Sequence, residues 1–145
     1  GKSFALQVAQ EDYDYYVLEL SSFQLDGMYD FKADIAILLN ITPDHLDRYD
    51  GVLERYAEAK FRIAMNQKEG DTFLYNLDNH VTVDFLENHP VSGPGLMGLH
   101  QPSLDSGVLN VNGNEYDLSN TALIGPHNAF NAFFALKTAL MIGVE

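Results

Sequence analysis

The sequence predicts an α/β domain built on a mainly parallel sheet flanked by helices, with a small antiparallel hairpin element. A near-continuous apolar run at residues 35–41 is typical of a strand covered on both faces, as in parallel sheets, and residues 71–77 read as a further buried strand. Stretches with helical spacing separate and flank these runs. The pair Asn112-Gly113 between two apolar runs is a strong hairpin signal. A length of 145 residues suits a single domain, 1–145, with one sizeable core.

The first part of the chain predicts a helix and then a strand. Residues 4–11 place Phe4, Val8 and Glu11 about one turn apart, and Ser3 is a suitable residue to cap the start of a helix. After a turn of acidic residues, residues 15–20 are rich in aromatic and aliphatic side chains. We expect this run to be a buried strand.

The central part predicts a strand, a helix and a further strand. The apolar run at 35–41 supplies the first of these strands. Residues 51–66 carry an apolar stripe at helical spacing, made of Val52, Tyr56, Ala59 and Ile63. The run at 71–77 follows the turn Glu69-Gly70 and reads as the next buried strand.

The last part predicts the hairpin and a long helix. Between residues 91 and 123 Pro and Gly become frequent, and the Asn112-Gly113 pair marks the turn of a small antiparallel element. Residues 126–142 are rich in Ala, Phe and Leu, with Pro126 in the first turn and Gly143 after the last. This pattern predicts one long helix.

Composition excludes several classes of function. The net charge of -13, from 21 acidic and 8 basic residues, excludes a nucleic-acid binder and a protein bound to anionic membranes, because both need clustered Lys and Arg. No apolar run approaches the roughly 20 residues that span a bilayer. The absence of Cys excludes disulfides and thiolate metal sites. We expect a soluble, cytoplasmic protein.

Glu19 lies where the predicted strand at 15–20 ends, in the segment Glu19-Leu20-Ser21-Ser22-Phe23-Gln24-Leu25. Open α/β sheets bind their ligands at this end of the strands. A carboxylate there is a suitable oxygen ligand for a magnesium ion that also holds phosphates. The alternative is a solvated loop acid beside the following turn.

The segment Asn40–Tyr49 follows the next predicted strand and contains Asp44, His45 and Asp47. Imidazole and carboxylate groups this close together suit a cation site. The alternative is a turn started by Thr42-Pro43 with a solvated His45. The spacing alone leaves both interpretations open.

Lys60 lies one turn beyond Tyr56, at the margin of the apolar stripe. A partly buried lysine there would have a more accessible neutral amine, because desolvation disfavours the ammonium. The alternative is an ordinary lysine whose stem covers apolar surface while its charge stays in water.

Asn128 and Asn131 lie three residues apart at the start of the last predicted helix, in the segment Gly125–Asn131. Each carboxamide offers one donor and one acceptor group, which complements an adenine edge. Capping of the helix is the alternative, and it explains one Asn better than two.

These four segments, in this order, resemble the Mur ligase family of peptidoglycan-building amide ligases. The resemblance covers essentially the whole chain and implies the Rossmann-like central domain of that family. The form Glu-Leu-Ser-Ser-Phe-Gln-Leu is similar to the branch that adds D-glutamate to UDP-N-acetylmuramoyl-L-alanine. These two molecules, ATP and Mg²⁺ are therefore the implied substrates and cofactors.

The resemblance also implies roles for individual residues. Glu19 matches a magnesium ligand, His45 matches a histidine that helps to hold a second magnesium ion, and Lys60 matches a lysine that carbon dioxide carbamylates. Asn128 and Asn131 match the pair near the adenine. Ser21 and Gln24 resemble residues close to the muramoyl substrate. The implied reaction passes through an acyl phosphate that the amine of D-glutamate attacks.

The sequence departs from the family pattern in one respect. No glycine-rich phosphate loop of the form Gly-x-x-Gly-Lys-Ser/Thr is present, and Gly1-Lys2-Ser3 resembles only the end of a later motif. We therefore expect a truncated domain that is inactive by itself, binds ATP weakly and leaves Lys60 unmodified. A sheet edge left open by such truncation would favour self-association.

Two other interpretations remain at this stage. A folylpolyglutamate synthase-like ligase domain belongs to the same superfamily, although the Ser-Ser-Phe-Gln-Leu stretch argues against it. A non-catalytic binding or interaction module would keep the fold without the reaction. The amino acid that the enzyme uses would separate the first alternative, and a clean monomer of high stability would favour the second.

Overall fold

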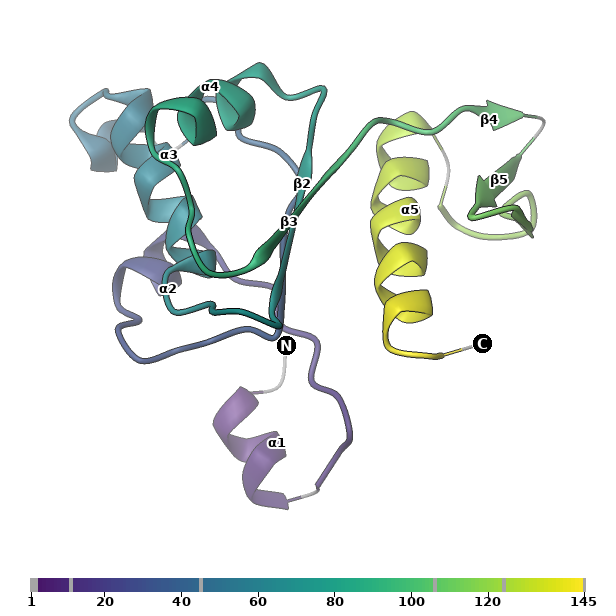
Figure 1. The fold of residues 1–145 in the computed structure, drawn as a ribbon, viewed down its shortest axis with the longest axis horizontal. Helices are drawn as coiled ribbons and strands as arrows, with labels where there is room; N and C mark the ends of the chain where they lie inside the picture. The colour runs from purple at the N-terminus through teal and green to yellow at the C-terminus, as the bar shows by residue number, and fades with distance from the viewer. Residues whose placement is uncertain (1–2, 11, 45, 106, 124, 145) are drawn as a thin grey trace.

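A computed structural model describes residues 3–10, 12–44, 46–105, 107–123 and 125–144. Figure 1 shows a parallel sheet with helices on both sides and a small antiparallel sheet beyond the last helix. The predicted fold class, a parallel sheet flanked by helices with an attached antiparallel element, is confirmed. None of the helices in the described ranges combines the length and apolar character that crossing a bilayer requires.

The helices and strands have the following bounds. The α-helices are α1 (Phe4–Gln10), α2 (Ser22–Asp26), α3 (Leu53–Phe61), α4 (His80–Asn88) and α5 (Pro126–Met141), and the 3-10 helices are η1 (Leu46–Tyr49) and η2 (Arg62–Ala64). The parallel sheet contains β1 (Ile35–Leu38), β2 (Thr72–Asn76) and β3 (Gly95–Leu99) in that spatial order. The antiparallel sheet contains β4 (Leu104–Asp105), β5 (Val108–Val111) and β6 (Asn114–Asp117).

The parallel sheet buries both of its faces, as its apolar strands predict. Ala36 of β1 is in register with Phe73 of β2, and both belong to the core beneath α3 and α4. Leu74, the next residue along β2, points to the other face and joins the core formed with α5. Successive residues of a strand point to opposite faces, so continuous apolar sequence follows from two-sided cover.

The helix α5 covers the second face of the parallel sheet and also supports the antiparallel sheet. Phe130, Phe133 and Phe134 of α5 form one core with Leu74 of β2 and with Leu109 of β5. In Figure 1 α5 stands between the two sheets. The long predicted helix is confirmed, and its phenylalanine residues join the sheets through a shared core.

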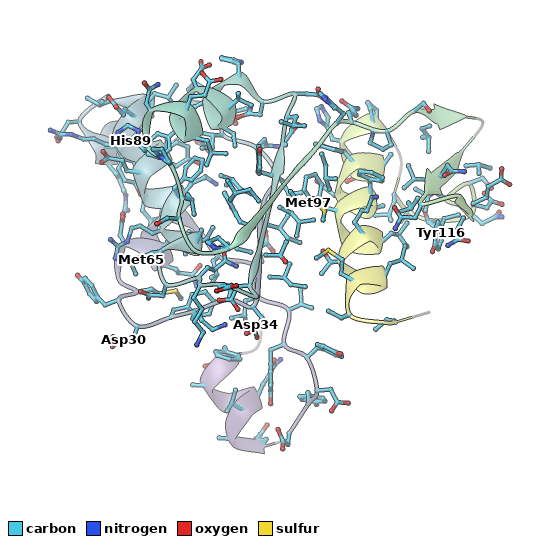
Figure 2. All side chains as sticks on the ribbon, in the orientation of Figure 1. Asp30, Asp34, Met65, His89, Met97 and Tyr116 are labelled. Atoms are coloured by element: carbon cyan, nitrogen blue, oxygen red, sulfur yellow. The ribbon has the colours of Figure 1, made fainter. Side chains whose placement is uncertain are left out.

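Polar groups close the amino end of the parallel sheet. The Lys32 ammonium lies 2.6 Å from Asp34 Oδ1 and 2.6 Å from Asp71 Oδ1. Figure 2 shows Asp34 at the end of the sheet where β1 begins. The Gln67 amide donates to the carbonyls of Ala33 (3.1 Å) and Thr72 (2.8 Å). These contacts tie the entry of β1 to the entry of β2.

The predicted hairpin is confirmed and gains a third strand. Val111 and Asn114 are paired, so Asn112 and Gly113 form a two-residue turn between β5 and β6. Their φ angles of 54° and 86° are both positive, as a type I′ turn requires. The strand β4 extends the hairpin by pairing with β5.

The predicted strand at residues 15–20 is wrong. This segment forms no ladder with any strand in the described part of the chain. Val17 is 98% exposed and Tyr15 is 55% exposed, so the run is not buried as predicted. Apolar composition indicates a tendency to be buried, but a strand also needs a neighbour to pair its backbone, which composition cannot show.

The helix predicted at residues 4–11 forms as α1, but none of its described residues is buried. Phe4 and Val8 of the expected apolar face are 43% and 51% exposed. The helix predicted at 51–66 is shorter than expected, because the α-helical part ends at Phe61 and continues as η2. Spacing identified both helices, although it did not identify what covers them.

The sequence analysis also missed four elements, α2, η1, α4 and β3. Asn79 caps α4 by accepting from the Thr82 N–H, a start signal that the sequence contains. The strand β3 pairs in parallel with β2, although its sequence Gly-Leu-Met-Gly-Leu lacks the continuous apolar character of β1 and β2. It is an outer strand with exposed residues, which explains why the buried-strand pattern did not find it.

Candidate active site

The carboxyl end of the parallel sheet is organised around Asn79. Its Oδ1 accepts from the N–H groups of Ile41 (3.3 Å) and Thr82 (3.0 Å), and from the Thr82 hydroxyl (2.7 Å). Its Nδ2 donates to the Ile41 carbonyl at 3.1 Å. One side chain therefore fixes the segment that follows β1 against the start of α4. That segment contains the predicted cation ligands.

A second polar group at this end joins the exits of β2 and β3. Asp78 accepts from the Gln101 N–H at 2.6 Å and lies 2.7 Å from His100 Nδ1. The backbone N–H of Gln101, followed by His100, lowers the pKa of Asp78 below its usual value. Asp78 therefore remains a carboxylate at neutral pH. Asp78 and Asn79 directly follow a strand, so the reasoning applied to Glu19 could have found them.

Ser21 and Gln24 form a capping box at the start of α2. The Ser21 N–H donates to Gln24 Oε1 at 2.9 Å, and the Gln24 N–H donates to Ser21 Oγ at 3.4 Å. These bonds satisfy backbone groups at the first turn of a five-residue helix. Both residues are exposed, and Glu19, two residues before the box, is exposed as well. The roles predicted for Glu19, Ser21 and Gln24 stay predictions.

Lys60 lies in the last turn of α3 and is half-buried. Its Nζ is 5.2 Å from the centroid of the Tyr56 ring. A cation over an aromatic face is attracted by the ring quadrupole, so this contact favours the side-chain position in which Nζ faces the ring. Tyr56 is itself buried, so it fixes which side of α3 faces the core and thereby the position of Lys60 on that helix.

Asn128 and Asn131 lie near the start of α5, as predicted. Asn128 is half-buried and Asn131 is exposed, three residues apart on one face of the helix. Figure 1 shows α5 beginning at the end of the sheet where β2 ends. The pair is therefore placed at the end of the sheet that carries Asp78 and Asn79.

The described residues do not show the predicted site residues sharing one cavity. A cavity of about 290 Å³ lies between α3 and α4, and one of about 460 Å³ lies beside β1. Neither is lined by Glu19, Lys60, Asn128 or Asn131. His45 lies outside the described residues. No group of three metal-binding side chains is present in the described ranges, so these residues by themselves do not fit a magnesium ion.

The adenine-binding role predicted for the two carboxamides on α5 stays a prediction. They have the donor and acceptor groups that an adenine edge needs, and Asn131 is open to solvent. Three sequence motifs also meet through aromatic side chains to which the sequence analysis gave no role in the site. Phe23 of the first motif stacks on Tyr49 of the second, and Tyr49 contacts Tyr56 of the third. The aromatic residues within these motifs were the sequence signal that could have indicated these contacts.

Comparison with known proteins gives a consistent result. The family described as Mur ligase middle domain matches residues 2–139. A UDP-N-acetylmuramoylalanine–D-glutamate ligase of Christiangramia forsetii is 45% identical over 155 residues, covering 100% of this chain and 35% of that protein. The ligase of the same name from Bacteroides fragilis is 42% identical over 154 residues, covering 99% and 34%. That from Cytophaga hutchinsonii is 40% identical over 163 residues, covering 100% and 35%. The chain thus spans about a third of the length of these relatives.

Proposed function

The chain belongs to the Mur ligase family, whose middle domain it matches, and on this basis we propose that it serves an ATP-dependent ligase joining D-glutamate to UDP-N-acetylmuramoyl-L-alanine. The supporting observation is 40–45% identity, over 99% or more of the chain, to relatives named for that reaction. The segment Glu19–Leu25, with its Ser-Ser-Phe-Gln-Leu form, supports the same branch of the family. A cytoplasmic location is part of the proposal, because ATP is available there.

Each predicted residue has a defined task in this proposal. Asn128 and Asn131 bind the adenine edge through their carboxamides. Ser21 and Gln24 contact the muramoyl substrate with the polar groups that remain beyond the capping box. In the complete enzyme, Glu19, His45 and a carbamate on Lys60 would hold Mg²⁺ together with ligands that the described residues of this chain do not supply, and the ion would neutralise phosphate charge.

The reaction needs an activated carboxylate and a positioned amine. ATP supplies the phosphoryl group that turns the carboxylate of the muramoyl substrate into a better electrophile. The contribution of the chain is to orient the reactants, because positioning and charge stabilisation provide most of the catalysis in phosphoryl transfer.

A chimeric ligase tests this proposal. The matched third of the Bacteroides fragilis ligase would be replaced by this chain, and phosphate release would be measured with ATP, UDP-N-acetylmuramoyl-L-alanine and either D- or L-glutamate. We expect release that depends on D-glutamate. Activity with another amino acid but not with D-glutamate would favour the folylpolyglutamate-type interpretation, and a folded chimera without activity would favour the non-catalytic module.

Paired variants of the chimera test the residue assignments. Asn131→Ala should raise the KM for ATP, whereas Asn120→Ala, in an exposed turn, should not. Lys60→Gln should lower kcat, whereas Lys68→Gln should leave it unchanged. Equal effects within a pair would contradict the assignment of that residue.

A further inference from the structure

Tyr49 connects three of the four sequence motifs that carry the predicted site. It is the last residue of η1 and of the segment with the predicted cation ligands, and only 8% of its surface is exposed. Its ring is nearly parallel to that of Phe23 on α2, with centroids 6.2 Å apart and planes 7° apart. Its ring also contacts that of Tyr56 on α3, with centroids 5.4 Å apart.

A cation lies over the aromatic ring at each end of this group. The Arg48 guanidinium is 4.5 Å from the centroid of Phe23, and Lys60 Nζ is 5.2 Å from the centroid of Tyr56. We call these five side chains the aromatic row. Contacts between rings, and between rings and cations, depend on orientation as well as on burial. The aromatic row therefore links the orientation of the Lys60 side chain to the orientation of α2 through a chain of ring contacts.

The Tyr49 hydroxyl adds polar contacts to the same helix. It donates to Asp26 Oδ2 at 3.0 Å, and the buried Ser22 hydroxyl bonds to it. A helix of five residues is not stable without external contacts. Tyr49 thus holds α2 at Ser22, Phe23 and Asp26.

The backbone fixes the distance between Tyr49 and α3. The Val52 N–H donates to the Tyr49 carbonyl at 2.9 Å, and the Gly51 N–H donates to the Leu46 carbonyl at 2.8 Å. Asp50 and Gly51 have φ angles of 54° and 74°, which define a tight turn. Tyr49 is therefore fixed to the start of α3 as well as to α2.

We propose that Tyr49 is a positioning residue of the ligase site, which holds α2, with Ser21 and Gln24, at a fixed orientation to Lys60 on α3. This inference rests on the proposed function, because Ser21, Gln24 and Lys60 are assigned through it. Tyr49 acts through Phe23 and Tyr56 and has no contact with a reactant in this argument.

The first test uses the chain itself and does not depend on catalysis. Protons next to Lys60 Nζ should show an upfield ring-current shift from Tyr56 in an NMR spectrum. Tyr56→Leu should abolish this shift, and Tyr49→Leu should abolish or strongly reduce it. The control Tyr116→Leu removes a ring from the other core and should leave the shift unchanged. An unchanged shift in folded Tyr49→Leu would overturn the proposal.

A milder variant covers the case in which Tyr49→Leu does not fold. Tyr49→Phe keeps the aromatic row and removes only the hydroxyl contacts with Ser22 and Asp26. The Lys60 shift should remain, while amide exchange at Gln24 and Leu25 should accelerate. Unchanged exchange at α2 would show that the hydroxyl contacts do not hold this helix, and loss of the Lys60 shift in folded Tyr49→Phe would overturn the proposal.

The second test uses the chimeric ligase. Tyr49→Leu should lower kcat about ten- to a hundredfold, since small displacements of positioned groups have effects of this size. Tyr49→Phe should retain most of kcat, and Tyr116→Leu should lower the melting temperature without lowering kcat at a temperature where it is folded. Full kcat in folded Tyr49→Leu would overturn the positioning role.

The two tests separate the inference from the proposed function. An inactive unsubstituted chimera that folds would contradict the proposed function, and with it the catalytic meaning of Tyr49. The NMR experiment would still decide whether Tyr49 couples α2 to Lys60. An active chimera in which Tyr49→Leu changes neither kcat nor the Lys60 shift would contradict the inference alone.

Discussion

Ser21 and Gln24 bond to each other, which gives them a structural task beside the one proposed for them. A capping box satisfies backbone N–H groups that otherwise have no partner in the first turn of a helix. Because α2 contains only five residues, this local effect is a large part of what holds it. Substitution of either residue therefore changes stability and substrate contacts together, and the two effects must be measured separately.

Ser21→Ala should lower the free energy of unfolding by about 1 kcal/mol, the usual loss for an N-cap. Urea unfolding followed by circular dichroism would measure it. Ser103→Ala, at an exposed position outside helices and strands, is the control and should change little. An equal loss in both variants would show that the capping box contributes nothing specific.

Asp71 should make stability depend on pH in the acid range. The Lys32 ammonium, together with the Lys68 N–H, holds the pKa of Asp71 below its usual value. The contribution of Asp71 is thus complete above the unfolded pKa near 4 and is lost as the pH falls through the lower folded value. Asp71→Asn should lower the free energy of unfolding at pH 7 and flatten its decline below pH 4.

Urea unfolding from pH 2 to pH 8 would measure this dependence. Asp34→Asn is the matched control, because Asp34 contacts the same ammonium while its side chain is 92% exposed. Asp34→Asn should lose less unfolding free energy at pH 7 than Asp71→Asn, since exposed ion pairs contribute little to stability. A larger loss for Asp34→Asn than for Asp71→Asn would contradict the account.

At the scale of individual residues, the sequence predicted the surroundings of a side chain better than the residues that it contacts. Lys60 was placed at the margin of an apolar stripe, and it is half-buried beside Tyr56. The Asp78–His100 contact joins residues 22 positions apart, and no local pattern predicts such a pair. Tyr49 was part of a motif that was noted for its acids and histidine, so its aromatic neighbours were not sought.

At the scale of elements, β1 and the segment 15–20 show what an apolar run does and does not predict. Both are short and apolar, but only β1 has a paired neighbour, β2. The hairpin was predictable because Asn112-Gly113 fixes its turn locally. The strand β3 was not, because its sequence Gly-Leu-Met-Gly-Leu is interrupted by glycine and its first residues are exposed.

Asn79 gives a test at this scale, because it joins the exit of β1 to the start of α4. Asn79→Ala removes the cap of α4 and leaves the Ile41 and Thr82 N–H groups without this acceptor. We expect a loss of about 2–4 kcal/mol in the free energy of unfolding. Asn79→Asp keeps the acceptor and should lose less. Equal losses of unfolding free energy in the two variants would show that the effect does not come from the cap.

The whole molecule combines open sheet edges with a high negative charge. Among the described strands, β1 and β3 each pair only with β2, and Leu96 of β3 is 49% exposed. Such edges favour pairing with another chain. A net charge of -13 on every copy opposes close approach. The balance between these two effects depends on salt.

We therefore expect self-association to increase with ionic strength. Light scattering after gel filtration should give a monomer mass at about 10 mM salt and a larger mass at about 1 M, where screening acts over only about 3 Å. Leu96→Lys places a charge on the β3 edge and should reduce the association. A monomer at both salt concentrations would contradict this expectation and would favour the stand-alone module.

The position of α5 in the chain affects how the protein is made. This helix follows both sheets in the sequence, and its phenylalanine side chains supply the surface on which Leu74 and Leu109 are buried. A ribosome adds roughly 5–20 residues per second, so β2 waits on the order of several seconds before α5 is synthesised. During that interval the nascent chain presents an uncovered apolar face. Chaperones that bind such faces therefore have their best opportunity before α5 emerges from the ribosome.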